Sequence, residues 1–123
     1  MLHHVALEVS PEDLKDEERF WLAAGFRKVP PPKDLGEDFS WYERQGTQVH
    51  LMRTAEPADP PVRGHVAVVS ENLDAAVERL KAEGFEVKEG RRLWGERRVK
   101  VKTAAGHLVE IMAGPPAQAS ETS

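Results

Sequence analysis

The chain contains two copies of one sequence unit, and this repeat limits the possible folds more than any other feature. The segment "HVALEV", which begins at His4, returns as "HVAVVS" at His65. Further along, "AGFRKV" returns as "EGFEVK", and "GTQVHLM" returns as "GHLVEIM". The three offsets are 61, 59 and 60 residues, and the order of the segments is the same in both copies. Matches of this regularity predict two similar structural modules in tandem.

The local pattern of the first copy, residues 1–52, predicts the element order βαβββ. We expect a helix that has Ser10 as its cap and Pro11 as its first residue, and that ends near Gly25. The strands of this module are expected at residues 2–9, 26–29, 39–44 and 48–52. Residues 53–63, "RTAEPADPPVR", are the predicted linker, because their prolines interrupt regular structure.

The second copy, residues 64–114, predicts the same order. Its helix carries an apolar face from Leu73 to Leu80 and should stop at Gly84. Its strands are expected at residues 65–70, 85–88, 97–102 and 108–112. The predicted fold class is therefore α+β, with two βαβββ modules in one domain over residues 1–114. Residues 115–123 contain few apolar side chains and are predicted to be a disordered tail.

Composition and charge narrow the classes of function. The 123 residues carry a net charge of -4, whereas nucleic acids and anionic membranes attract basic surfaces, so neither partner is expected. The sequence offers no membrane-spanning apolar run and no secretion leader, so we expect a cytoplasmic protein that acts on a small molecule. Because the chain has no cysteine, a metal ion would need His, Asp or Glu ligands.

Residue types that bind metals stand at corresponding positions of the two copies. His4 corresponds to His65, and His50 corresponds to Glu110. Each alternates with apolar neighbours along its strand and should therefore point away from the face that the helix covers. Two sheets related by a two-fold axis would bring these four side chains together, and such a set suits Zn, Fe, Ni or Mn. The alternative is four unconnected surface residues.

Five segments, in their order and spacing, resemble the vicinal oxygen chelate superfamily: "HHVALEV", "TQVHLM", "GHVAVV", "LDAAVERLKAEGFEV" and "AAGHLVEIM". This superfamily includes glyoxalase I, fosfomycin-resistance proteins, extradiol dioxygenases and bleomycin-resistance proteins. The resemblance implies an open, mixed-sheet barrel around a divalent metal ion that chelates two neighbouring oxygens of a substrate. It also implies the ligands His4, His50, His65 and Glu110. His50 stands where glyoxalase I has its basic carboxylate, so that reaction is not expected.

Further site residues follow from strand alternation. In "RRVKVK", the valines should face the helix, while Arg98 and Lys100 face the predicted metal site. We expect Glu110 and Arg98 to be catalytic and expect Arg98, Lys100, Trp41 and Trp94 to contact an anionic substrate. The alternatives are a solvated basic strand face and two core tryptophans.

Two functional hypotheses remain open from the sequence. One is a metal-dependent enzyme of the lyase, isomerase or dioxygenase type, in which the ion stabilises negative charge on the substrate. The other is a metal-free protein that sequesters a drug or another ligand, as bleomycin-resistance proteins do. In either case we expect a homodimer. The linker is long enough to leave two arrangements open, a site within one chain or a site shared between chains. We favour the shared site, in which His4 and His50 of one subunit meet His65 and Glu110 of the other.

Overall fold

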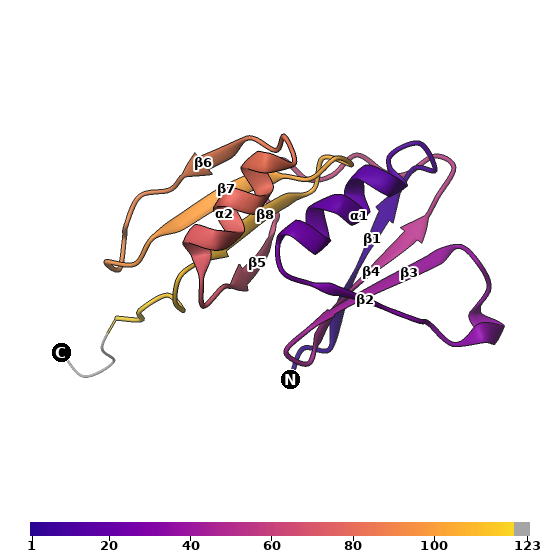
Figure 1. Cartoon of the computed structure of the whole chain (residues 1–123), viewed down its shortest axis with the longest axis horizontal. Coiled ribbons are helices and arrows are strands. Elements are labelled where there is room, and N and C mark those ends of the chain that lie inside the picture. The colour runs from indigo at the N-terminus through magenta and orange to yellow at the C-terminus, as the bar shows by residue number, and fades with distance from the viewer. Residues whose placement is uncertain (120–123) are drawn as a thin grey trace.

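The computed structural model describes residues 1–119, and within them the chain forms two βαβββ modules, as predicted (Figure 1). The first module comprises β1 (His4–Val9), α1 (Leu14–Ala23), β2 (Arg27–Val29), the short 3-10 helix η1 (Lys33–Leu35), β3 (Phe39–Arg44) and β4 (Thr47–Arg53). The second comprises β5 (Val66–Val69), α2 (Leu73–Ala82), β6 (Val87–Glu89), β7 (Arg98–Lys102) and β8 (Leu108–Met112).

Each module contains one four-stranded mixed sheet. The strand orders are β1-β4-β3-β2 and β5-β8-β7-β6. The first strand of each module pairs in parallel with the last, while the other pairs are antiparallel. Neither sheet closes on itself, which agrees with the predicted α+β class and with an open barrel.

The start of α1 differs from the prediction. The helix begins at Leu14, because residues 11–13 form a turn in which the Asp13 N–H donates to the Ser10 carbonyl at 3.1 Å. The Ser10 hydroxyl donates to the Asp13 carboxylate at 3.2 Å, so it caps no helical N–H group. Asp13 occupies the N-cap position without a side-chain cap bond. The prediction that Ser10 caps the helix and Pro11 begins it was therefore wrong.

The hydrophobic core runs through both modules. It contains Phe20 and Trp21 of α1, Leu80 of α2 and the inward-facing residues of the central strands, such as Val49 and Val109. The two helices contact each other, and each lies over the sheet of its own module, on the same side of the molecule (Figure 1). At their junction, the Arg79 guanidinium donates to the Ala23 carbonyl at 2.8 Å. The modules of one chain therefore pack against each other side by side, through contacts between their helices.

A buried carboxylate reinforces this junction. Glu17 of α1 is fully buried, and it accepts hydrogen bonds from the Trp21 indole at 3.1 Å and from the Ala105 N–H at 2.9 Å. Ala105 lies in the turn between β7 and β8, so this contact joins the two modules. In the same turn, the His107 ring lies 2.9 Å from the Glu8 carbonyl oxygen of β1. The turn thus connects the second module to both α1 and β1.

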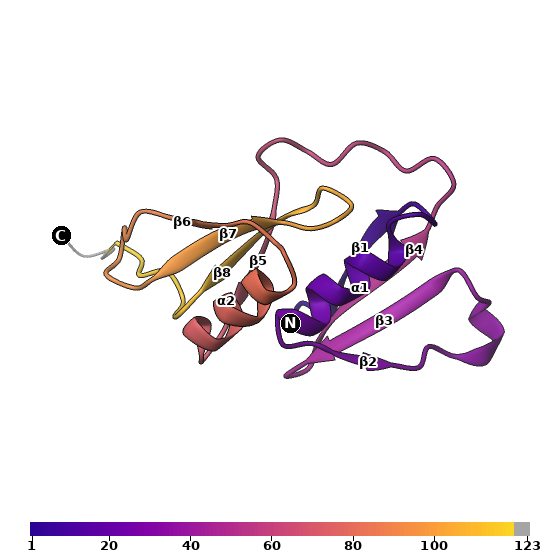
Figure 2. The ribbon, with the colours of Figure 1, turned by 45° about the horizontal axis from the view of Figure 1, so that its top comes forward.

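The segment between β4 and β5 passes outside the packed modules as a long arch (Figure 2). No helix within residues 1–119 is long and apolar enough to cross a membrane. Of the tail predicted to be disordered, residues 115–119 are exposed and have no regular structure, while residues 120–123 lie outside the described part of the chain.

Candidate functional site: two half-sites on the open sheet faces

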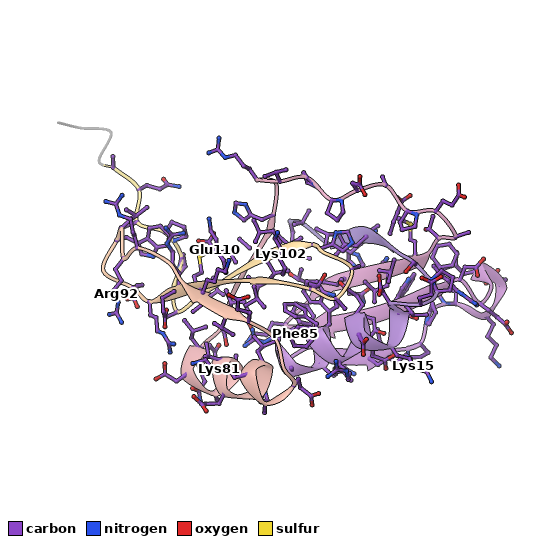
Figure 3. All side chains as sticks on the ribbon, turned by 90° about the horizontal axis from the view of Figure 1, so that it is seen from above. Lys15, Lys81, Phe85, Arg92, Lys102 and Glu110 are labelled. Carbon is purple, nitrogen blue, oxygen red and sulfur yellow. The ribbon has the colours of Figure 1, made fainter. Side chains whose placement is uncertain are left out.

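The predicted site residues lie on the sheet faces that the helices leave open. In β7, Val99 and Val101 are buried toward the helix, whereas Arg98 and Lys100 are only partly buried on the other side. Figure 3 shows Glu110 and Lys102 on the side of the second sheet away from Lys81 of α2. The alternation inferred from the sequence thus separates core residues from site residues.

The first sheet carries an aromatic cluster, which we call the imidazole half-site (His4, His50 and Trp41). The His50 ring stacks between the other two rings, with centroid distances of 3.9 Å to His4 and 4.0 Å to Trp41. This arrangement follows from the sheet, because Trp41 lies directly opposite His50 in the β3–β4 register. The rings line a cavity of about 330 Å³ with Phe39 and Met52.

The protein environment keeps His50 neutral. Its side chain is buried, and its Nε2 lies 2.7 Å from the Gln48 Oε1 atom. Burial, with smaller contributions from the nearby His4 and His3 rings, lowers the pKa of His50 from its usual 6.5 to about 4. A neutral imidazole is the form that binds a metal ion. Gln48 was not recognised from the sequence, although it lies two residues before His50 and therefore on the same strand face.

The second sheet carries the carboxylate half-site (His65, Glu110 and Arg98). The His65 Nε2 atom lies 3.4 Å from Glu110 Oε1, while its Nδ1 atom lies 2.9 Å from the Arg63 carbonyl oxygen. Because a carbonyl oxygen can only accept, Nδ1 carries a proton, and in the neutral ring the lone pair of Nε2 faces the carboxylate. A protonated His65 ring would form an ion pair with Glu110, and a neutral ring would place two metal-ligand atoms side by side.

Several contacts fix Arg98 against Glu110. Its Nη1 atom donates to Glu110 Oε2 at 2.5 Å, and its Nε atom donates to the Arg91 carbonyl at 2.8 Å. The guanidinium also lies over the Trp94 ring, 5.3 Å from the ring centre. Gly90 leaves room for this side chain, because an added Cβ atom would lie 3.1 Å from Arg98 Cγ. Arg98 therefore occupies one carboxylate oxygen and leaves the other facing His65.

The remaining predicted residues also lie at these half-sites. Lys100 is directly opposite Glu110 in the β7–β8 register. The indole N–H groups of Trp41 and Trp94 are buried and have no hydrogen-bond partner among residues 1–119. Buried donors are nearly always paired, so both indoles are candidates to contact a group that a single chain does not supply.

One chain does not bring the two half-sites together. His4 and His50 meet on the first sheet, and His65 meets Glu110 on the second. Within residues 1–119, no three His, Asp or Glu side chains come close enough to hold one metal ion. Each half-site offers two ligands of the kind that zinc, iron, nickel and manganese accept, and a complete set needs both halves.

The family comparison agrees with this architecture. The model of the Glyoxalase/Bleomycin resistance protein/Dioxygenase superfamily matches residues 13–111. A search of curated proteins finds no match.

Several solved structures share the fold. A glyoxalase family protein from Bacillus anthracis is 20% identical, with a TM-score of 0.79 over 91% of this chain and 93% of that chain. A point mutant of the fosfomycin resistance protein FosX from Listeria monocytogenes, in complex with Mn(II) and 1S,2S-dihydroxypropylphosphonic acid, is 24% identical, with a TM-score of 0.73 over 94% of this chain and 90% of that chain. A glyoxalase/dioxygenase from Nostoc punctiforme is 21% identical, with a TM-score of 0.75 over 94% of this chain and 92% of that chain.

Proposed function

Since the chain belongs to the Glyoxalase/Bleomycin resistance protein/Dioxygenase superfamily, we propose that it is a metal-dependent enzyme that acts on a small anionic molecule. Its ligands are His4, His50, His65 and Glu110. The reaction is of the lyase, isomerase or dioxygenase type, because these share the need to stabilise negative charge on substrate oxygens. Zn, Fe, Ni and Mn are the candidate ions, and the FosX complex holds Mn(II).

The observation that carries this proposal is the state of the two half-sites. The His65 Nε2 atom lies 3.4 Å from a carboxylate oxygen of Glu110, so two metal-ligand atoms stand side by side. The low pKa of about 4 keeps His50 uncharged, so this ring need not lose a proton before it binds a metal ion. The burial of His50 and Glu110 favours this proposal over four solvated surface residues.

The complete site forms in a homodimer, with the imidazole half-site of one subunit facing the carboxylate half-site of the other. Within one chain a helix covers one face of each sheet, while the other faces are open and carry the cavities at the two half-sites. A second copy presents the complementary half-site to each open face, and two-fold symmetry creates two equivalent sites.

Each residue then has a role. A divalent ion supplies a Lewis acid that polarises substrate oxygens. Arg98 is a positioning residue, because its contact with Glu110 Oε2 fixes the carboxylate and leaves Oε1 for coordination. Trp41 holds the His50 ring by stacking and forms an apolar wall for the substrate. Lys100, opposite Glu110, attracts negative charge on the substrate.

Elemental analysis of protein purified without a histidine tag tests the proposal. After incubation with each candidate ion, we expect about one divalent ion per chain, and none in His65→Ala or Glu110→Ala. His107→Gln is the matched control, because His107 lies in the β7–β8 turn and should leave the metal content unchanged. Wild-type protein that stays empty with every ion would overturn the proposal and favour a metal-free ligand-sequestering protein.

A further inference from the structure

A large cavity lies over β6 and β7 on the open face of the second sheet. Its volume is about 580 Å³, and its lining includes Lys88, Lys100 and Lys102. Figure 3 shows Lys102 on the same side of this sheet as Glu110. The cavity therefore adjoins the carboxylate half-site, and its lining includes three lysine side chains from two strands.

These lysines are arranged unfavourably for the isolated chain. Lys88 lies directly opposite Lys100 in the β6–β7 register. Like charges at directly opposed positions of an antiparallel pair destabilise a sheet. Within residues 1–119, none of the three lysines forms a salt bridge. On its other side Lys100 lies directly opposite Glu110, but that carboxylate already pairs with Arg98, so the like-charged pair lacks a carboxylate of its own.

The other charged residues of the cavity leave an excess of positive charge. Glu89 pairs with Arg97, and Arg98 pairs with Glu110, so these acidic groups are already engaged. Glu86 and Arg91 also line the cavity and have opposite charges. The three lysines remain uncompensated, although the whole chain has a net charge of -4. The net charge around this cavity is therefore positive, whereas the net charge of the whole chain is negative.

We propose that this cavity binds the doubly charged anionic group of an organic molecule, with Lys88 and Lys100 as its principal contacts. A dianion neutralises both members of the opposed pair, whereas a monoanion leaves one charge in place. The volume exceeds that of the anionic group, so the organic part of the same molecule extends toward Glu110. This inference rests on the proposed function, because it identifies the substrate class of that site.

Two kinds of group carry such a charge: a phosphate-type oxyanion and a pair of carboxylates. Isothermal titration of the chelator-treated full chain distinguishes them with inorganic phosphate, malonate and acetate as probes at about pH 8, where phosphate carries about two charges. We expect phosphate or malonate to bind at least about tenfold more tightly than acetate. Binding of phosphate alone identifies the oxyanion, and binding of malonate alone identifies the carboxylate pair.

Variants locate the binding. Lys88→Gln and Lys100→Gln should each weaken binding of the dianion by about tenfold to a hundredfold. Lys15→Gln in α1 and Lys81→Gln in α2 are matched controls, because both residues are exposed and lie away from the cavity (Figure 3), and they should bind as wild type does. Without ligand, Lys88→Gln should also raise the melting temperature, because it removes the repulsive pair.

The proposal fails if acetate binds as tightly as the dianions, if no probe binds, or if the two cavity variants bind as wild type does. Elemental analysis of the same proteins, incubated with each candidate ion instead of the chelator, separates this failure from that of the proposed function. Metal binding without dianion binding would overturn the inference alone, whereas dianion binding without metal would overturn the proposed enzyme alone.

Discussion

Replacement of Glu17 by alanine should destabilise the protein more than any other single loss of a charged group in α1. The carboxylate is fully buried and accepts from the Trp21 indole and the Ala105 N–H. A buried donor that loses its partner costs about 1 to 3 kcal/mol. Trp21 is fully buried, while Ala105 is partly accessible to water, so the second donor costs toward the lower end of that range.

The two donors together predict a loss of about 2 to 4 kcal/mol in the free energy of unfolding for Glu17→Ala. The alanine variant no longer has to bury a carboxylate, and this gain offsets part of the cost of the two unpaired donors. The expected loss therefore stays below the sum of the two upper limits. Glu17→Gln should lose less, about 1 to 2 kcal/mol, because its amide oxygen still accepts one of the two hydrogen bonds.

Urea unfolding followed by tryptophan fluorescence measures these differences. The matched control is Asp16→Ala, since Asp16 is on the same helix but forms only an exposed ion pair with Arg19. That variant should lose no more than about 1 kcal/mol. If Glu17→Ala were no less stable than Asp16→Ala, the assigned connection between α1 and the β7–β8 turn would be refuted.

Two further predictions concern the half-sites. The pKa of His50 is lowered to about 4 in the folded protein, against its usual 6.5. The His50 ring therefore takes up a proton more readily in the unfolded chain than in the folded protein. In metal-free protein the resulting stability is intact above about pH 6.5 and is lost as the pH falls toward 4, by at most about 3 kcal/mol. Urea unfolding of His50→Gln should show a shallower pH dependence, and an unchanged slope would contradict this. Arg98→Gln should weaken metal binding about 10- to 100-fold in a chelator competition, with Arg97→Gln, on the helix side, unaffected.

Strand alternation predicted correctly which face of the sheet several candidate site residues occupy. A period of two residues places each side chain on one face, so His50, Arg98 and Glu110 could be assigned to the open faces from their apolar neighbours alone. The repeat then predicted the corresponding position of His65. These features depend on neighbours in sequence and need no knowledge of tertiary contacts.

Features that depend on register or on distant contacts could not be predicted. The opposed pair Lys88 and Lys100 follows from the alignment of β6 with β7, which the sequence of either strand does not specify. The contact of Glu17 with Ala105 joins residues far apart in the chain. At the start of α1, the side chain of Ser10 contacts Asp13, and this local competition displaced the predicted cap.

The central claim is that a metal site forms between two chains. Mixing two variants that each lack one metal ligand tests it most directly. His4→Ala removes a ligand from the imidazole half-site, and Glu110→Ala removes one from the carboxylate half-site. After reversible dissociation and random reassociation, half of the dimers are mixed, and each mixed dimer has one intact shared site. The account predicts metal binding at about a quarter of the wild-type level. If mixed dimers form and metal binding stays absent, both half-sites must belong to one chain, and the account is wrong.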